Sequence, residues 1–473
     1  MKMKKYFLKL VLLFFIGGMI SNLASAEIKL PAIFCNNMVM QQQTNAMVWG
    51  KANPNAVVKV TTSWNKKSYN TRSSENGSWK LKVSTPIAGG PYEMVISDGT
   101  PVTLKNVLIG EVWVCSGQSN MEMPLKGFMN QPILGSLETI NNSSNPNIRM
   151  FTVTKKTSIL PLDSLGGKWD LCEPEFVGDF SATAYYFGLM LNKTLNVPIG
   201  LINTSWGGTR IEPWISDAGF KNFDWVKMPE KKPVVNLSPQ TPTVLFNGMI
   251  NPIVGYGIRG AIWYQGESNR NEAKAYQKLM PGLIENWRSV WDNGDFPFYF
   301  VQIAPYDYGL TGLSSAYLRE AQLKASTAIK NTGMACIMDI GEKNNIHPAN
   351  KKAGGDRLAY LALANTYNIK GIVSQGPVMK EMTINGSNVK LSFDFAPLGL
   401  TSFGKEVTSF EVAGSNKKFY PAKAIINKNE ILLSSPQVDQ PIAVRYAFKD
   451  FIVGELFNTY GLPASSFRTD DWE

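Results

Sequence analysis

The chain has 473 residues, of which 44% are hydrophobic and 18% are charged, and its formal net charge is +10. This composition excludes a largely disordered chain, and the length predicts two or three domains. The charge includes four lysines near the N-terminus, without which it falls to +6, and no basic cluster indicates a nucleic-acid-binding protein.

Residues 1–26 have the pattern of a secretory signal peptide. Three lysines among the first five residues precede an apolar run at 10–20, and Ala24-Ser25-Ala26 is a small-residue cleavage site. The run is too short for a spanning helix, and no later stretch reaches the roughly 18 apolar residues that such a helix needs. We therefore expect export to the periplasm or the extracellular space, without membrane insertion.

Residues 27–105 are predicted to form an N-terminal β-sandwich domain. Apolar and polar residues alternate in AMVWGKA, AVVKVTTSW, SWKLKVSTP and YEMVISD, and Asn-Pro-Asn, Asn-Gly-Ser and Gly-Gly-Pro turns separate these stretches. Residues 373–473 are predicted to form a second, C-terminal β-rich domain, because VKLSFDF, EILLSS and PIAVRYAF are again short strands between turns.

Residues 106–372 are predicted to form an α/β domain. The nearly continuous apolar runs are typical of buried parallel strands, and they are VLIGEVWVCSG, VPIGLINTS, IRGAIWYQG, FPFYFVQIA and GMACIMDIG. Helical patterns separate them, over 182–195, 272–291, 316–329 and 353–364. Strands that alternate with helices indicate a mainly parallel sheet.

Polar or glycine-rich segments follow four of these strands, at the edge of the sheet where ligands bind in α/β folds. One contains Ser119, one Gly207-Gly208, one Gln265, and one His347, the single histidine of the chain. A single imidazole excludes mechanisms that need two in one subunit, including those of most zinc hydrolases. A serine hydrolase needs only one, with Ser119 as the hydroxyl and His347 as its base.

An ester hydrolase also needs donors that face the developing oxyanion. The candidates are the backbone N–H of Ser119, that of Gly208 or its neighbour Gly207, and the side-chain amide of Gln265 or Asn269. The residue types leave the choice within each pair open.

Four motifs resemble those of the sialate O-acetylesterase family, which belongs to the SGNH or GDSL-like hydrolases: GQSNM at 117–121, SWGGTRIEPW at 205–214, WYQGES at 263–268 and DIGEKNNIHPANK at 339–351. The resemblance implies a flavodoxin-like α/β/α sandwich with a parallel sheet, between β-sandwich-like flanking regions. It implies hydrolysis of acetyl esters on sugars without metal or organic cofactor. By position it assigns Ser119 and His347 to catalysis, with Gly208 and Gln265 as oxyanion donors.

One position departs from the pattern of these hydrolases. They commonly carry an aspartate three residues before the histidine, whereas this chain has Asn344, which cannot be the anion that stabilises an imidazolium. The candidates for the third member are Asp339 and Glu342 from the same loop and Glu267 from another strand end. An asparagine side chain such as that of Asn344, or a backbone carbonyl, is the alternative, in a serine–histidine dyad.

Asn120, Trp206 and Asn269 are predicted to contact the substrate, an O-acetylated glycan or sialic acid. Of the tryptophans Trp206, Trp214 and Trp263, at least two are expected to lie in the core.

Four other functions stay open. They are an acetylxylan or pectin-type deacetylase of the same fold, a degenerate esterase that binds glycan, a lipase, and a glycosidase that uses Glu122 and Glu267.

Overall fold

A mostly parallel sheet runs through the middle of the computed structural model, which describes residues 28–232, 236–309 and 312–472. The predicted signal peptide lies outside these ranges. The strand order of the sheet is β13–β12–β11–β7–β10–β8–β9, and neighbours pair in parallel except β8 with β9. The strands are β7 (Pro101–Gly117), β8 (Asn145–Thr152), β9 (Trp169–Cys172), β10 (Ile199–Ser205), β11 (Gly260–Tyr264), β12 (Phe298–Val301) and β13 (Thr332–Ala335). The predicted mixed α/β region with a mainly parallel sheet is confirmed.

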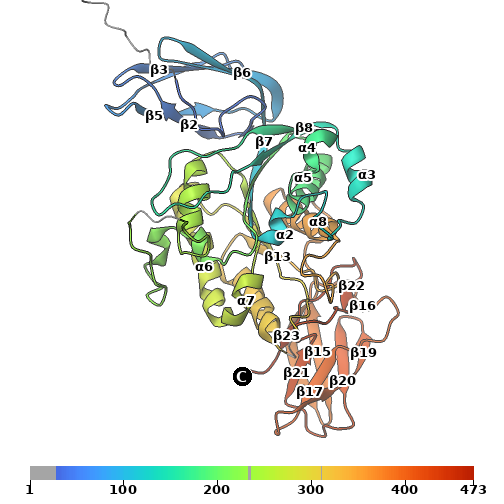
Figure 1. Cartoon of the computed structure of the whole chain (residues 1–473). Helices are drawn as coiled ribbons and strands as arrows, with labels where there is room; N and C mark the ends of the chain where they lie inside the picture. The colour runs from blue at the N-terminus through green and yellow to red at the C-terminus, as the bar shows by residue number, and fades with distance from the viewer. Residues whose placement is uncertain (1–27, 233–235, 310–311, 473) are drawn as a thin grey trace, which may run out of the picture.

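Helices cover both faces of this sheet (Figure 1). Alternate side chains of β7 point into two cores: Val112 and Val114 join a cluster with helices α6 and α7, and Trp113 and Cys115 join a cluster with α5 and α8. The helices are α2 (Ser119–Glu122), α3 (Ser136–Asn141), α4 (Pro174–Val177), α5 (Ala182–Leu195), α6 (Ala273–Trp291), α7 (Ser314–Ala328) and α8 (Lys351–Leu361). None of the helices in the described ranges is long and apolar enough to cross a membrane.

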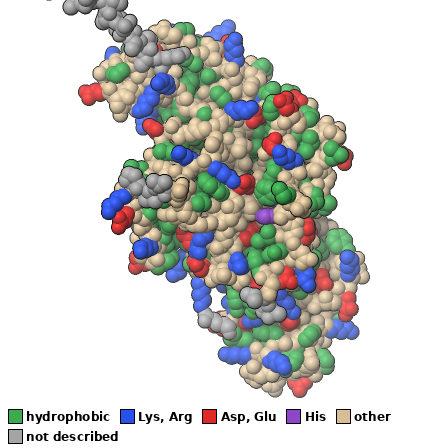
Figure 2. Space-filling model, viewed as in Figure 1, with side chains coloured by type: hydrophobic (Ala, Val, Ile, Leu, Met, Phe, Trp, Pro, Cys, Tyr) green, Lys and Arg blue, Asp and Glu red, His purple; other side chains and the backbone are tan. Residues whose placement is uncertain are grey.

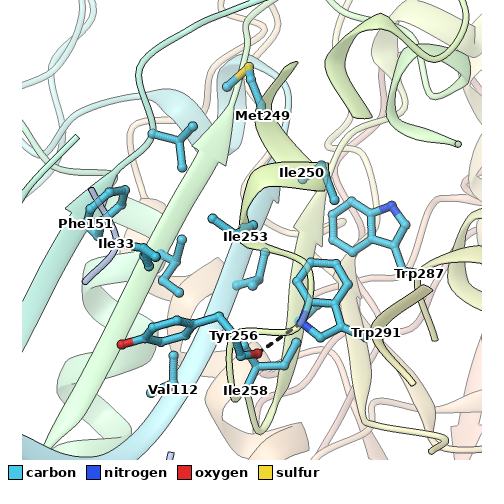
Figure 3. Close-up of a cluster of buried hydrophobic side chains, with 14 of the residues drawn as sticks. Ile33, Val112, Phe151, Met249, Ile250, Ile253, Tyr256, Ile258, Trp287 and Trp291 are labelled. Carbon is cyan, nitrogen blue, oxygen red and sulfur yellow. Dashed lines mark hydrogen bonds between the residues drawn. The ribbon is translucent and has the colours of Figure 1, made fainter. Parts of the chain in front are cut away.

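Tryptophans of α6 anchor the first of these cores (Figure 3). Trp287 and Trp291 are buried, and the indole N–H of Trp291 donates to the carbonyl of Tyr256 at 3.2 Å. Ile33, from the segment before β1, lies in the same cluster. The core therefore joins the N-terminal segment to the α/β region.

The four helices that the sequence predicts are present within a few residues. The helix predicted at 182–195 has these bounds, and Ser181 caps its start by accepting a hydrogen bond from the Ala184 N–H at 3.1 Å. The edge pair β8–β9 was not predicted, since polar residues interrupt both strands and neither shows a continuous apolar run. Short 3₁₀ and π turns complete the region: η1 (Glu212–Trp214), η2 (Asp217–Phe220), η3 (Phe246–Ile250), η4 (Asn251–Ile253), η5 (Glu267–Glu272) and η6 (Ala362–Thr366).

Mostly antiparallel strands flank the α/β region on two sides (Figure 1), with β1 as an exception that pairs in parallel with β7. The N-terminal strands are β1 (Val39–Gln41), β2 (Asn45–Lys51), β3 (Val57–Thr62), β4 (Ser68–Arg72), β5 (Ser78–Ser84) and β6 (Gly89–Ser97), and the long β7 pairs with β6 before it enters the central sheet. The C-terminal strands are β14 (Val378–Asn385), β15 (Asn388–Asp394), β16 (Leu400–Thr401), β17 (Phe410–Ala413), β18 (Phe419–Pro421), β19 (Lys423–Asn427), β20 (Glu430–Ser434), β21 (Ala443–Tyr446), β22 (Phe457–Asn458) and β23 (Phe467–Arg468).

Candidate active site

The chain makes a tight turn where β7 ends, and this turn presents Ser119. Gly117 has φ +140°, and a Cβ there would lie 2.1 Å from the carbonyl oxygen of Tyr264, so no side chain fits. Gln118 follows, with its N–H bonded to the Tyr264 carbonyl at 2.9 Å, and Ser119 then begins helix α2. The close approach of β7 and β11 therefore fixes where the serine hydroxyl lies.

The hydroxyl of Ser119 is in direct contact with the imidazole of His347. Oγ lies 2.8 Å from Nε2, and Nδ1 on the other side of the ring lies 2.7 Å from Oε1 of Gln131. The ring of Phe128 packs edge-on against the imidazole, with 5.5 Å between centroids. In Figure 2 the histidine is visible in the middle of the molecular surface, so solvent reaches the pair.

The imidazole of His347 is held neutral over most of the pH range. Partial burial lowers its pKa, the positive charge of Lys351 lowers it further, and together they bring it to about 4. A neutral ring whose Nδ1–H donates to Gln131 presents the lone pair of Nε2 to Ser119. Gln131 carries no charge, so nothing at Nδ1 raises this pKa.

The carboxylates predicted to orient the ring lie elsewhere, and these predictions were wrong. Asp339 forms a bidentate ion pair with Arg357, with N–O distances of 2.6 and 2.7 Å. Glu342 accepts from the side chain of Asn345 and from the N–H of Ala349, so it braces the loop rather than the ring.

Two further predicted candidates do not touch the ring either. Glu267 is buried and bonded to Asn120 at 2.6 Å. Asn344 is exposed, and within the described ranges the hydrogen bonds of the ring go to Ser119 and Gln131 alone.

Two backbone N–H groups of the turns around the serine are free in the part of the chain that the structure describes: that of Ser119 itself and that of Gly208, the residue after Gly207. Gly207 lies against Ser119, since a Cβ on this glycine would come within 3.3 Å of the serine Cβ. The N–H of Gly207, however, donates to the carboxylate of Glu122. Of the two adjacent glycines, Gly208 is thus the one with a donor available.

The predicted amide donor, Gln265, points away from the serine. Its side chain is fully buried, and the amide donates to the carbonyl of Thr209 at 3.1 Å and to Oδ1 of Asn269 at 2.8 Å. Asn269 is buried as well: Oδ1 also accepts from the N–H of Ile211, and the amide donates to Glu212. The prediction that either amide faces the oxyanion or the substrate was wrong, because both side chains are buried and form hydrogen bonds with the loop after β10.

The sequence matches a known family of esterases. A profile described as carbohydrate esterase, sialic acid-specific acetylesterase, matches residues 109–363, just over half of the chain. The chain belongs to this family. The sialate O-acetylesterase of Mus musculus is 30% identical over 438 residues, which cover 80% of each protein, and that of Homo sapiens is 29% identical over 385 residues, 74% of this chain and 73% of the relative.

A solved structure supports the same assignment. The crystal structure of a carbohydrate acetylesterase from Xanthomonas citri has a TM-score of 0.87 at 34% identity, and the match covers 94% of this chain and 100% of the other. The protein is therefore a carbohydrate O-acetylesterase, a carboxylic ester hydrolase, and the resemblance seen in the sequence is confirmed.

A buried polar network lies behind the serine of this acetylesterase. Asn120 is fully buried: its amide donates to Glu267 at 2.6 Å and to the carbonyl of Ile346 at 3.1 Å, and its Oδ1 accepts from the ammonium of Lys351 at 2.5 Å. The prediction that Asn120 contacts substrate was wrong. It joins the turn that carries Ser119 to the loop that carries the histidine.

The charges in this network shift each other's pKa. Burial lowers the pKa of Lys351 to about 7, while Glu267 and Glu342 oppose the shift. Burial likewise raises the pKa of Glu267, and one of its carboxylate oxygens has no hydrogen-bond partner within the described ranges. Removal of one charged member from such a buried arrangement leaves the other charge uncompensated, which is strongly destabilising.

Trp206 remains a candidate for contact with the sugar ring in the acetylesterase. It is partly exposed next to Gly207, and the ammonium of Lys155 lies 5.4 Å from its ring centroid. Trp214 and Trp263 are fully buried and pack edge-to-face, which confirms the expectation that at least two of the three belong to the core.

The glycosidase alternative is contradicted, because the carboxylate of Glu267 is buried rather than open to a glycan.

Sequence reasoning missed two residues of the site, Gln131 and Lys351. Gln131 lies in the segment between α2 and α3, 216 positions before His347, and no periodicity or motif marks it. Lys351 opens helix α8 four residues after the histidine, and its place at the end of the motif at 339–351 was the only available signal. Lysines are rarely fully buried, so composition argues against such a placement.

Proposed function

We propose that Ser119 is the nucleophile and His347 the general base of this acetylesterase. The observation that carries the proposal is the 2.8 Å contact between Oγ and Nε2. Oγ bonds the acetyl carbonyl carbon while its proton passes to Nε2. The C–O bond to the sugar then breaks, and the sugar oxygen takes that proton. Water next gives a proton to Nε2 and attacks the acetyl-enzyme, which releases acetate and returns the proton to Ser119.

The oxyanion of each tetrahedral intermediate would be held by the N–H groups of Ser119 and Gly208. Both lack an acceptor within the described ranges; the first belongs to the serine itself, and the second follows Gly207, which lies against Ser119. Donors that are fixed in place before reaction stabilise developing charge without reorganisation. The amide of Gln265 contributes indirectly, since it supports the loop that carries Gly208.

Gln131 is expected to orient the imidazole in place of the usual aspartate. In a Gln131→Ala variant we expect kcat for acetyl ester hydrolysis to fall about 10- to 100-fold, because a hydrogen bond to a charged ring contributes roughly 1.5–3 kcal/mol. In Gln131→Glu the new carboxylate should raise the pKa of His347 and move the acid limb of the kcat/KM profile to higher pH. Met129→Ala, an exposed neighbour, is the control. Unchanged kcat in Gln131→Ala would contradict this role.

The wild-type enzyme should stay active in mildly acidic solution. Its base works only when neutral, so lowering the pKa of His347 to about 4 places the rise of kcat/KM near pH 4. The rate should then remain level toward neutral pH. Acetate release measured between pH 3 and 8 tests this expectation, and a rise centred near the ordinary histidine value of about 6.5 would contradict it.

We propose O-acetylated sialic acids as the substrates, because the matching family and the mammalian relatives carry that specificity in their names. Acetylated xylan and pectin-type glycans are the alternatives. The test measures kcat/KM for acetate release from O-acetylated sialic acid, acetylated xylan and acetylated pectin, with an octanoyl ester to detect lipase activity. Highest kcat/KM on the sialic acid is the expected result. Higher values on either polysaccharide would reassign the substrate, and no release from any of them would favour the glycan-binding alternative.

Further proposals concern organisation and location. We propose that the central region has the SGNH-type flavodoxin-like architecture, and that the mature chain divides at about residues 105 and 372 into β, α/β and β domains. We also propose that residues 1–26 direct export to the periplasm or beyond. N-terminal sequencing of the secreted protein would test the cleavage site, which we expect before Glu27.

A further inference from the structure

A cavity of about 890 Å³ opens between the N-terminal strands and the α/β region, and the esterase mechanism does not use it. Strands β2, β4 and β5 form one wall, and two loops around Asp163 and Gly255 form the other. None of the residues that line it belongs to the turn of Ser119 or the loop of His347. Figure 1 shows β2 and β5 apart from α2, where the serine lies. Cavities of roughly 300–1,000 Å³ are typical of ligand sites.

One wall of the cavity carries an aromatic side chain. Met47, Trp49 and Lys51 alternate along β2, so they share the face that lines the cavity. Trp49 is only partly buried, and Phe34 holds its ring edge-on at 4.6 Å between centroids. Indoles combine a large apolar face with a polar N–H and few rotamers, so this fixed ring is suited to pack against the C–H face of a pyranose.

The charges around the cavity are mostly positive. Lys29, Lys51, Arg72 and Lys80 line it, against the single carboxylate of Asp163. None of the four cations has an ion-pair partner within the described ranges. Lys51 donates to the hydroxyl of Ser78 and Arg72 to a backbone carbonyl, which leaves the ammonium groups of Lys29 and Lys80 for a ligand.

The positions of these groups combine stacking with charge. Lys80 pairs directly with Trp49 across the β2–β5 ladder, so the two side chains leave the same face of the sheet as neighbours. Lys29 enters from the segment that pairs with the end of β2 at Lys51. The substituents of a sugar ring that lies on the indole would therefore face lysine ammonium groups. A carboxylate is the sugar substituent that complements their positive charge.

We propose that this cavity is a second glycan site, which binds a sugar residue that carries a carboxylate. The pyranose ring packs on Trp49, and its carboxylate pairs with Lys29 and Lys80. Sialic acids and hexuronic acids share this chemistry. The site holds the glycan while Ser119 acts elsewhere, so its contribution appears in binding rather than in the chemical step.

Isothermal titration calorimetry tests the proposal on the full chain that carries Ser119→Ala, so that no ligand is turned over. The probes are 3′-sialyllactose, trigalacturonic acid and, as a neutral sugar, lactose. We expect at least one acidic probe to bind, and its Kd to weaken at least tenfold on adding Lys29→Gln with Lys80→Gln. Trp49→Ala should weaken it similarly, and 0.5 M salt should weaken it too. Which acidic probe binds identifies the source of the carboxylate.

Controls separate this site from the rest of the molecule. The control variant, Lys59→Gln with Lys67→Gln, removes two exposed lysines of the N-terminal β region that do not line the cavity. It should leave the Kd unchanged. The variant with Lys29→Gln and Lys80→Gln, but with Ser119 intact, should hydrolyse p-nitrophenyl acetate at the wild-type rate. Trp49 contacts the core, so Trp49→Ala could destabilise the fold. In that case the Kd of the Lys29/Lys80 variant still tests the proposed site. Equal binding of lactose, or an unchanged Kd in the Lys29/Lys80 variant, would overturn the proposal.

Discussion

Alanine at position 119 is expected to lower kcat for acetyl ester hydrolysis about 10⁴-fold or more, the scale seen when a serine hydrolase loses its nucleophile. The structure gives the physical reason, since Oγ of Ser119 is the hydroxyl that Nε2 of His347 can deprotonate. Removal of this oxygen leaves no atom to form the acetyl-enzyme, while the free N–H groups nearby can still polarise a carbonyl. Residual activity above the uncatalysed rate is therefore expected.

Acetate release from p-nitrophenyl acetate and from an acetylated sugar measures the effect. The matched control is Ser268→Ala, which changes the serine next to Glu267 at the end of the neighbouring strand and leaves the Ser119–His347 pair intact. We expect its kcat to stay within a few-fold of wild type. Turnover that survives Ser119→Ala, or that is lost only in Ser268→Ala, would overturn the assignment of the nucleophile.

The sequence is informative where a residue's position follows from the sheet itself. Buried parallel strands read as apolar runs, and the carboxyl ends of such strands meet at one edge. Ser119 follows β7 directly, and His347 lies in the segment after β13, so the order of residues is enough to place both near that edge. The spacing of Leu279, Leu283 and Trp287 likewise predicts the buried face of α6.

The sequence does not predict side-chain contacts that depend on loop conformation. Strand periodicity ends with Tyr264, so the direction of the next side chain depends on the acceptors it meets, and Gln265 turns to Thr209 and Asn269. Gln131 reaches His347 from a loop whose path no local pattern encodes. The missing aspartate is visible in the sequence, but only the contact itself identifies its replacement.

The largest structural effect is expected from Lys351→Met, which removes the cation of the buried network and keeps an unbranched side chain of similar volume, one atom shorter. Asn120 then loses its 2.5 Å donor, and Glu267 keeps a buried carboxylate without a nearby cation. Removal of one partner from a buried ionic arrangement typically lowers the free energy of unfolding by about 3–5 kcal/mol. We expect the free energy of unfolding to fall by about that amount, as measured by denaturant titration followed by circular dichroism.

The adjacent lysine supplies a matched control. Lys352 is exposed and pairs with Asp356 one turn along α8, so Lys352→Met should change the free energy of unfolding by less than about 1 kcal/mol. Adding Glu267→Gln to Lys351→Met neutralises the orphaned carboxylate, and the double variant should recover part of the lost stability. Equal losses in the Lys351 and Lys352 variants would show that the buried charge has no special role.

Activity separates a positioning role for Lys351 from a purely structural one. Asn120 ties the serine turn to the loop of His347, so a loosened network should lower kcat at least tenfold while KM changes little. Burial is the main reason that the pKa of His347 is low, but the charge of Lys351 adds to it. Its removal should raise that pKa and shift the acid limb of the kcat/KM profile above pH 4. If Lys351 acted only by filling space, the limb would stay in place, because methionine has a similar volume and preserves most of the packing.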